Sequence, residues 1–366
     1  MTSWERLELT FAGCQTDRTP ILGGWISCPE HVATIARASL SEYWADPLAV
    51  SICAYRALGA DGLIDVVIPK RREDYRIVDA GSYLKAKGMS VDEAVARIES
   101  MPGGREIEKA YDAEREYASF RESLRTRQSM CGPDMVWMPA QWDLPAKVTW
   151  YSEFGYETFF TLVGEHSHLV AKLFEIGGAR GHCIARTLAR AVRDGVYPHA
   201  VLLGEDICSQ RGPMISPQFM AEYWKPHLRH SLEPVLDAGC RPVWHSDGNV
   251  MPLVDMLLEC GVQGFQGFQP DCGVTLDQFL SRRSATGDPL LIFGPLAVTT
   301  GLPVWSASET ARQVHRAIDQ CRDRARLVVF TANTVNPDVP LENILAMHDA
   351  VGSRAVGERD GVQAQH

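Results

Sequence analysis

Eight short apolar segments, separated by stretches with helical spacing, constrain the fold of this chain more than any other feature. Most of them are continuously apolar, which is typical of parallel strands that are covered on both faces. Repeated strand–helix alternation of this kind predicts an α/β protein of the (β/α)8 TIM barrel class. A doubly wound open sheet gives a similar alternation and is the alternative fold. The segments lie at residues 21–24, 62–68, 135–139, 200–204, 241–244, 264–268, 290–293 and 327–330.

Two of the intervening stretches carry clear signals for the start of a helix. Ser216 and Pro217 supply an N-cap and a proline at the first helical position, so we predict a helix over 217–238. Ser306 and Glu309 have the spacing of a capping box and predict a helix over 307–324. Both helices precede a predicted strand, as the barrel requires.

The chain has the composition of a globular protein with a sizeable core. It has 366 residues, of which 45% are hydrophobic and 22% are charged. The sequence contains no internal repeat and no low-complexity linker, so we expect a single barrel domain over residues 1–351. The charge-rich stretch near 103–127 predicts an inserted, exposed helix held by i,i+4 ion pairs. The polar segment 352–366 is expected to be a flexible tail.

The net charge and the cysteine content limit which partners and which cellular compartment are expected. A net charge of −10 argues against nucleic acid or an anionic membrane as the main partner. No apolar run reaches the roughly 18 residues that span a bilayer, and the first residues lack the apolar stretch of a signal peptide. The ten cysteines form no C-x-x-C pair, which favours reduced thiols. We therefore expect a cytoplasmic protein that acts on a small molecule.

Polar side chains follow several of the predicted strands, where a barrel places its active site. The stretch W-H-S-D-G-N delivers His245 and Asp247 directly after the fifth strand. These two residues can share a metal ion, or one can orient the proton of the other. Alternatively, they simply cap the next helix.

Two adjacent carboxylates, Glu205 and Asp206, follow the fourth strand. We expect Asp206 to face the pocket and Glu205 to form an outward salt bridge. Burial and the charge of Asp247 should raise the pKa of Asp206, which suits general acid–base chemistry. The alternative is a structural pairing of Asp206 with Arg211 or with a neighbouring backbone N–H.

The catalytic candidates are therefore Asp206, His245 and Asp247. For a metal, the candidate ligands are His245, Asp247 and Cys272, with Asp206 and Asp271 as further carboxylates. Cys272 can also be a reactive thiol, but with ten cysteines in the chain a chance occurrence is favoured. Residues near the other strand ends are candidates for substrate binding: Trp25, Gln141, Trp142, Arg211, Phe268, Gln269 and Asn333.

Five stretches of the sequence resemble the uroporphyrinogen decarboxylase superfamily, whose members include corrinoid-dependent methyltransferases. They are F-G-Y-E-T-F-F at 154–160, G-E-D-I-C-S-Q-R-G-P-M-I-S-P at 204–217, W-H-S-D-G-N at 244–249, G-V-Q-G-F-Q-G-F-Q-P at 261–270 and N-P-D-V-P-L-E-N-I-L-A-M at 336–347. The resemblance covers residues 18–351. It implies a (β/α)8 barrel, a tendency to form homodimers, and an active site at the carboxyl ends of the strands.

The sequence departs from the decarboxylase branch after the first strand. That branch carries an arginine-rich R-Q-A-G-R-Y element there, which holds the acidic side chains of the substrate. This chain has G-G-W-I-S-C-P at 23–29, with no basic residue. Because a polycarboxylate needs bidentate arginine partners, decarboxylation of a porphyrinogen is disfavoured.

The sequence also departs from the methyltransferase branch, which binds zinc through H-x-C and a later cysteine. His245 matches, but Asp247 stands at the position of the first cysteine, and residues 331–334 offer no second one. A site of histidine and carboxylates suits a harder divalent metal, with zinc the first candidate and manganese, iron or magnesium as alternatives. A metal-free site in which His245 acts as acid or base is also consistent with the sequence.

These observations predict a methyl-transfer enzyme as the leading function. It would act on a small methylated compound, with a corrinoid carried by a partner protein, or a thiol, as acceptor. Asp206, His245 and Asp247 would form the polar centre, and Trp25, Trp142 and Phe268 would wall the pocket. A decarboxylase or lyase that holds a small acid through Arg211 is the first alternative. A non-catalytic binding protein on the same barrel is the second.

Overall fold

The computed structural model describes residues 1–71 and 88–352 and has a mixed α/β fold with parallel strands. The chain forms two compact units by internal contacts. Unit 1 comprises residues 1–68, 127–138 and 291–366, and unit 2 comprises residues 69–126 and 139–290. The division does not test the prediction of one barrel domain over residues 1–351, which stays a prediction.

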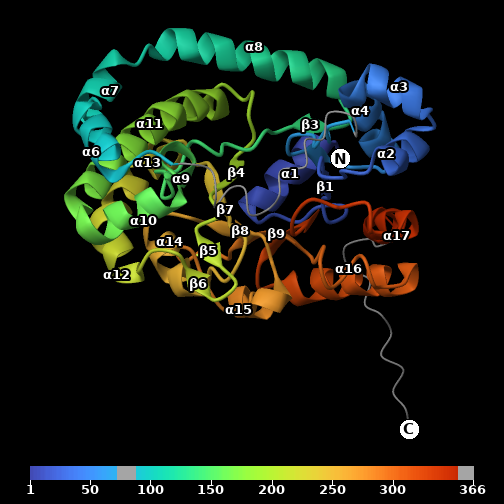
Figure 1. Cartoon of the computed structure of the whole chain (residues 1–366). Helices are drawn as coiled ribbons and strands as arrows, with labels where there is room; N and C mark the ends of the chain where they lie inside the picture. Colours follow the sequence, from blue (N-terminus) through green and yellow to red (C-terminus); the bar gives the residue numbers. More distant parts are fainter. Residues whose placement is uncertain (72–87, 353–366) are drawn as a thin grey trace. The chain divides into compact units, whose positions relative to one another are not determined.

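Unit 1 contains two sets of parallel strands. Strands β1 (Leu22–Gly23), β2 (Gly62–Leu63) and β3 (Val136–Trp137) pair in that order. Strands β9 (Leu291–Leu296) and β10 (Arg326–Thr331) pair along six residues each. The helices of unit 1 include α16 and α17, which pack side by side (Figure 1). They are α1 (Ser3–Ala12), α2 (Pro29–Ala36), α3 (Leu40–Ala45), α4 (Pro47–Ala57), α16 (Ala307–Cys321) and α17 (Leu341–Gly352).

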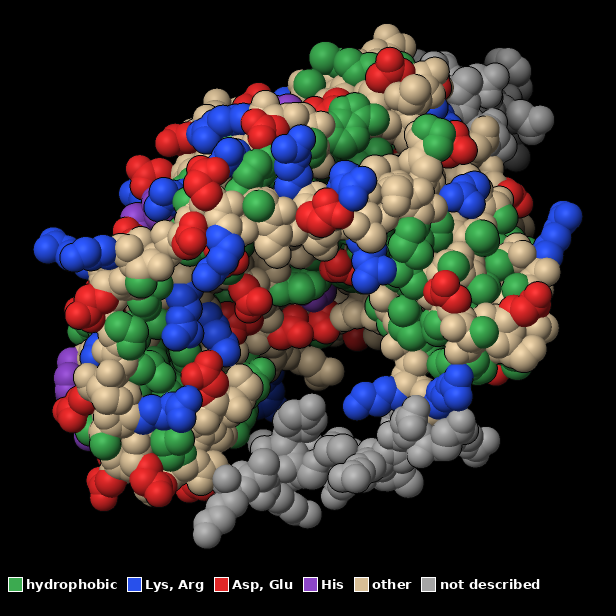
Figure 2. Space-filling model, turned by 90° about the horizontal axis from the view of Figure 1, so that it is seen from above, with side chains coloured by type: hydrophobic (Ala, Val, Ile, Leu, Met, Phe, Trp, Pro, Cys, Tyr) green, Lys and Arg blue, Asp and Glu red, His purple; other side chains and the backbone are tan. Residues whose placement is uncertain are grey.

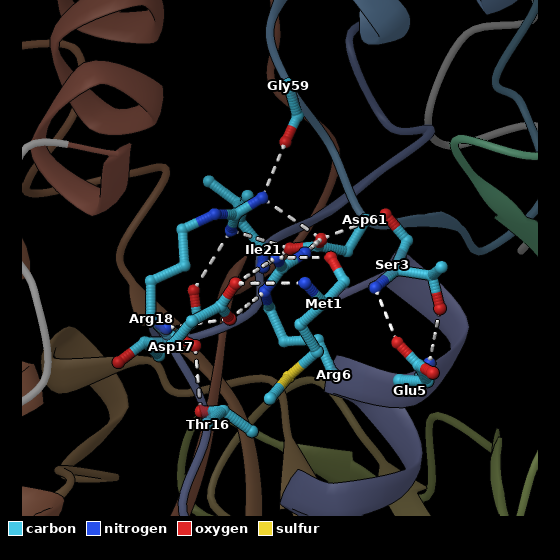
Figure 3. Close-up of polar contacts among 12 residues, drawn as sticks. Met1, Ser3, Glu5, Arg6, Thr16, Asp17, Arg18, Ile21, Gly59 and Asp61 are labelled. Carbon is cyan, nitrogen blue, oxygen red and sulfur yellow. Dashed lines mark hydrogen bonds and ion pairs between the residues drawn. The ribbon is translucent and has the colours of Figure 1, made fainter.

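A buried carboxylate ties the start of unit 1 together. Asp61 is fully buried just before β2 and accepts hydrogen bonds from the guanidinium groups of Arg6 and Arg18. It also accepts the backbone N–H of Ile21 at 2.9 Å, at the start of the first strand region (Figure 3). Arg6 in addition forms a two-bond contact with Asp17, at 2.7 Å for each bond. Because a buried charge is tolerated only when it is paired, this network fixes α1 against the loop between α1 and β1.

Unit 2 is built on three parallel strands and a short hairpin. Strands β4 (Ala200–Gly204), β7 (Arg241–His245) and β8 (Gly264–Gln266) pair in that order. The hairpin consists of β5 (Cys208–Ser209) and β6 (Gly212–Pro213). In the sequence, the α-helices of unit 2 come before, between and after these strands. They are α6 (Val91–Ser100), α7 (Gly104–Ala110), α9 (Tyr151–Phe154), α10 (Tyr156–Glu165), α11 (Ser167–Arg193), α12 (Pro217–Phe219), α13 (Lys225–Asp237), α14 (Val254–Glu259) and α15 (Asp277–Leu280). Helix α8 (Ala113–Cys131) passes from unit 2 into unit 1.

Glycines on α11 allow this long helix to pack closely against its neighbours. A Cβ atom at Gly178 would lie 2.8 Å from the Cβ atom of His227 on α13, which lies beside α11 (Figure 1). One at Gly181 would lie 2.1 Å from the carbonyl oxygen of Leu144, and one at Gly177 would lie 2.9 Å from the backbone nitrogen of Lys147. These distances are shorter than any real Cβ contact, so only glycine permits this approach. The segment 144–147 is thereby held against one face of α11.

Each of the eight predicted strand segments contains a strand, and every paired strand among them is parallel. The sequence analysis missed only the short strands β5 and β6 of the hairpin among the described strands. The predicted boundaries differ most at the second segment, where β2 ends at Leu63 instead of continuing to residue 68, and β8 of the sixth segment ends at Gln266 instead of Phe268.

The predicted helices are largely confirmed, with three differences. Residues 217–237 are helical throughout, but Met220–Trp224 form a π-helical turn just before Pro226, which has no N–H to donate. Ser306 caps α16 as predicted, whereas the Glu309 side chain bonds to Arg312 and Gln313 and so completes no capping box.

The charged stretch near 103–127 is a third difference, because it forms two helices, α7 and α8, instead of one. Its described ion pairs are Arg115–Glu116, the i,i+3 pair Glu122–Arg125, Glu114 with Arg190 of α11, and Glu108 with His230 of α13. None of them is an i,i+4 pair, so the predicted i,i+4 pairing is wrong. Of the predicted tail, residues 353–366 lie outside the described residues.

The surface seen in Figure 2 carries acidic and basic side chains that are interspersed with one another. This mixing differs from the field of a single sign that a nucleic-acid groove presents. Within the described part of the chain, none of the helices combines the length and the apolar character that a bilayer crossing demands.

Candidate active site

The candidate site lies at the carboxyl ends of two neighbouring strands of unit 2. Gly204, the last residue of β4, is in register with His245, the last residue of β7. Gly204 has a φ of +142°, and a Cβ atom there would lie 2.1 Å from the carbonyl oxygen of His245. Glycine is therefore required for β4 to end beside His245. The chain then turns so that Asp206 follows at the same edge.

Asp206, His245 and Asp247 are brought together as the sequence predicts. The Nε2 atom of His245 lies 3.5 Å from Oδ1 of Asp206. The same oxygen accepts the backbone N–H of Asp247 at 2.8 Å. One donor atom from each of the three side chains lies within 4.8 Å of the others. The three residues thus form one polar group, with His245 buried and Asp206 exposed.

The imidazole of His245 is held from both sides. Its Nδ1 atom is hydrogen-bonded to Oε1 of Gln266, the last residue of β8, which is itself buried. Trp142 approaches it edge-on, with ring centroids 5.6 Å apart and planes at 73°. Because Oε1 is an acceptor, Nδ1 carries a proton, and Nε2 is the atom presented to Asp206.

The charges of this group shift its pKa values in opposite directions. Burial lowers the pKa of His245, but the hydrogen bond and charge of Asp206, the charge of Asp247 and the bond to Gln266 outweigh burial and raise it. Burial likewise raises the pKa of Asp206, but His245 and the N–H of Asp247 outweigh burial and lower it. The expectation of a raised pKa for Asp206 is therefore wrong, since the nearby imidazole stabilises the carboxylate. The pair is favoured as carboxylate and imidazolium.

Glu205 has a structural partner instead of the predicted outward salt bridge. Its carboxylate accepts the backbone N–H groups of Val148 and Thr149 at 2.7 and 2.8 Å, and the Thr149 hydroxyl. Burial raises the pKa of Glu205, although these three donors and the charge of Lys147 lower it in part. Glu205 thus anchors the segment that leads into α9.

The donor set of the polar group fits a divalent metal ion. Gln266 fixes the proton of His245 on Nδ1 and leaves Nε2 available as a ligand, which is the usual arrangement around metal-bound histidines. Two carboxylates complete a hard donor set of the kind that zinc, manganese, iron(II) and magnesium accept. Cys272, the third predicted ligand, is not a member of the group. Its thiol contacts Oε1 of Gln269 at 3.6 Å, and burial raises its pKa, so it stays protonated.

A cavity of about 820 Å³ in unit 2 opens onto the polar group. Its size is that of a pocket for a small organic molecule. Among the predicted site residues, Trp142, Asp206 and His245 line it. Its walls are mainly aromatic and aliphatic and carry two cationic side chains. The lining includes Ile107, Tyr111, Lys147, Trp150, Arg180 and Ile184.

Several predicted substrate-binding residues do not line this cavity. Arg211 is exposed at the turn of the β5–β6 hairpin, so the proposed carboxylate partner of a decarboxylase is not in place. Phe268 is 2% exposed and packs edge-on against Phe279, as a core residue. Gln141 donates its backbone N–H to Leu202 at 2.8 Å and so positions the segment that carries Trp142.

Gln269 orients the loop after β7 instead of facing the cavity. Its Nε2 donates to Oδ1 of Asp247 at 3.1 Å, and its Oε1 accepts the backbone N–H of Gly248 at 2.8 Å. Asp271 is exposed and belongs to no described metal-ligand group. Gln269 is therefore a positioning residue for Asp247.

Two further candidates, Trp25 and Asn333, belong to unit 1. Trp25 is 7% exposed, donates its indole N–H to the carbonyl of Ile64 at 2.8 Å, and packs 4.8 Å from the ring of Phe330. Asn333 accepts the backbone N–H of Thr334 at 2.6 Å through its side chain. Both have local structural contacts within their own unit.

The sequence analysis missed four residues of the site. Gln266 sits inside a predicted strand, where a buried amide needs a partner; that requirement was the available signal. Lys147, Trp150 and Arg180 lie outside the strand ends, and only the close packing of α11 on segment 144–147 brings them to the cavity. A search for polar residues directly after predicted strands does not find residues that reach the cavity through helix packing.

Comparisons with known proteins support the fold. No family profile and no curated protein sequence matches the chain. Among solved structures, a methyltransferase from Methanosarcina mazei is similar over 96% of this chain and 99% of its own, with a TM-score of 0.58 and 15% sequence identity. Likeness at this identity shows the fold alone. It is consistent with the resemblance of the sequence to the methyltransferases of the uroporphyrinogen decarboxylase superfamily.

Proposed function

We propose that this protein is a methyl-transfer enzyme on a uroporphyrinogen decarboxylase-like (β/α)8 barrel. It takes the methyl group of a small O-, N- or S-methyl compound and passes it to a corrinoid on a partner protein, or to a thiol. One observation carries the proposal: a buried His245, charge-paired with Asp206, faces a largely apolar cavity at the carboxyl ends of parallel strands. The fold likeness to a methyltransferase supports the same reaction class.

The polar group can assist the departure of the demethylated heteroatom. The bond between the methyl carbon and the heteroatom breaks, its electron pair stays on the heteroatom, and the methyl group bonds to the nucleophile of the acceptor. The proton on Nε2 of His245 passes to the heteroatom, which leaves His245 neutral. Asp206 stabilises the imidazolium before transfer, and Gln266 keeps the ring oriented throughout.

A bound divalent metal would instead supply Lewis-acid chemistry, by polarising the heteroatom. Asp206, His245 and Asp247 would hold it, through Nε2 and two carboxylates. Metal analysis of the purified protein distinguishes the two versions. A second described group of possible ligands contains His182, so His182→Ala is the control. Stoichiometric metal that is lost in His245→Ala and kept in His182→Ala supports the metalloenzyme. No metal, with unchanged ligand binding in His245→Ala, would favour a non-catalytic binding protein.

The test of the reaction is direct. The purified protein is mixed with a reduced corrinoid protein and a panel of small methoxy, methylamine and methylthio compounds, and the visible spectrum of the corrinoid is followed. A second series replaces the corrinoid with a thiol and measures the methylated thiol. We expect turnover with at least one compound. If neither acceptor is methylated across the panel, the proposal is wrong.

Decarboxylation of a small acid is the second candidate, because Arg180 lines the cavity although Arg211 does not. His245, held as an imidazolium by Asp206, would then protonate the carbanion that remains when carbon dioxide leaves. Release of carbon dioxide from a small acid, without any methyl acceptor, identifies this reaction and excludes the first.

A further inference from the structure

The cavity of unit 2 has a cationic end in addition to its polar group. Lys147 Nζ lies 5.0 Å from the ring centroid of Trp150, and Arg180 Cζ lies 5.9 Å from the same centroid. Trp150 is 1% exposed, so its ring is a fixed platform, whereas Arg180 is exposed to the cavity and to solvent. Both cations therefore mark one place on the cavity wall.

Among the charged side chains that line the cavity, only Arg180 and the exposed Asp143 are without a described ion pair or hydrogen bond. Asp206 is paired with His245, and Lys147 Nζ lies 3.6 Å from a carboxylate oxygen of Glu153. Glu205 already accepts hydrogen bonds from Val148 and Thr149. Arg180, by contrast, forms no ion pair with any described residue, and its guanidinium lies over the Trp150 ring. The guanidinium group of an arginine can donate two parallel hydrogen bonds to the two oxygens of one carboxylate.

We propose that the cavity selects small molecules that carry a carboxylate on a flat apolar body, with Arg180 as the specificity-determining residue. The carboxylate binds the Arg180 guanidinium, and the flat body lies along Trp142 and Tyr111, whose rings line the cavity and keep exposed surface. Lys147 contributes less, because Glu153 already shares its charge. This inference names the substrate class of the proposed methyl-transfer site and rests on that proposal. Its test measures binding alone and requires no methyl transfer.

The position of Arg180 is fixed by the fold and is not a chance surface location. Gly177, one turn before it on α11, allows the helix to approach the backbone of Lys147 to a distance that a Cβ atom would block. Gly177, Arg180 and Ile184 follow one another at helical spacing and all line the cavity. The same helix face thus carries both the close contact and the cation.

Equilibrium binding of benzoate and benzamide tests the inference without any methyl transfer. The two probes have the same flat body and differ in the charge of the polar group, and neither carries a methyl group to transfer. Calorimetric titrations use the full-length wild type, Arg180→Gln, Lys147→Gln, and Arg193→Gln as a matched control at the end of the same helix and outside the cavity. Circular dichroism verifies that each variant is folded.

We expect the wild type to bind benzoate about tenfold more tightly than benzamide, as the gain from one charge-assisted contact predicts. Arg180→Gln should remove this preference, Lys147→Gln should reduce it less, and Arg193→Gln should leave it unchanged. Equal binding of the two probes by the wild type, no binding of either at millimolar concentration, or a preference that survives in Arg180→Gln would overturn the inference. Failure of methyl transfer with benzoate binding intact would count against the proposed reaction alone.

Discussion

At the scale of single residues, His245 is defined by what lies on each side of its ring. Gln266 accepts from Nδ1 and Asp206 faces Nε2, so both nitrogens see an acceptor. An imidazole between two acceptors gains by carrying both protons. The sequence predicts His245, Asp206 and Asp247 as a group, because polar residues that follow neighbouring strands converge. It does not predict Gln266, because the sixth strand ends two residues earlier than its apolar run suggests.

The raised pKa of His245 leads to a prediction on its titration. Asp206 is the largest of the partners that raise it, so Asp206→Asn should lower the pKa of His245. Titration of the imidazole by NMR measures this directly, with Asp237→Asn, outside the cavity, as the control. Because the pKa is raised on folding, the stability that His245 contributes is present below its unfolded pKa and is lost as pH rises through the folded value. A His245 pKa that does not change in Asp206→Asn would contradict the pairing.

At the scale of elements, the strands are predictable and the cavity wall is not. Continuous apolar runs mark buried parallel strands, so the positions of β1 to β4 and β7 to β10 follow from the sequence. The wall depends on how closely α11 approaches segment 144–147. That approach is set by Gly177 and Gly181, whose partners are far away in the sequence. Local patterns therefore locate Asp206 and His245 but miss Arg180 and Trp150.

The close packing of α11 predicts a large effect of one added methyl group. In Gly181→Ala the new Cβ would lie 2.1 Å from the carbonyl oxygen of Leu144, so backbone must shift. We expect a loss of about 1–3 kcal/mol in the free energy of unfolding, measured by chemical denaturation. The control is Gly164→Ala near the end of α10, where nothing lies within 4 Å of the added atom. This control should be neutral or slightly stabilising. Equal effects of the two substitutions would show that the packing of α11 is not tight.

At the scale of the whole molecule, a buried histidine in unit 1 makes stability depend on pH. His348 on α17 is 5% exposed, and its Nδ1 atom has no hydrogen-bond partner among the described residues. Burial lowers its pKa to about 4. At pH values between about 4 and the unfolded pKa, His348 is therefore protonated in the unfolded chain and neutral in the folded chain. Stability should be complete above the unfolded pKa and should fall as pH decreases toward 4.

His348→Leu should remove this part of the acid sensitivity. In the wild type, His348 contributes at most about 1.4 kcal/mol per pH unit to the decline in the free energy of unfolding. Denaturation at several pH values between 7 and 4.5 measures the slope. His166→Gln, a half-buried histidine in unit 2, is the matched control and should keep the wild-type slope. A slope that is the same in His348→Leu and in the wild type would show that His348 titrates normally.

The central claim is that Asp206 and His245 form the reacting centre of a methyl-transfer enzyme. Its most direct test is the initial rate of methyl transfer to the acceptor by the wild type, His245→Ala and Asp237→Asn, with folding verified for each. A general acid accounts for a factor of about 10²–10⁴ in rate. We predict a loss of about 100-fold or more in His245→Ala and less than about twofold in Asp237→Asn. A folded His245→Ala variant that transfers methyl groups at the wild-type rate would contradict the account.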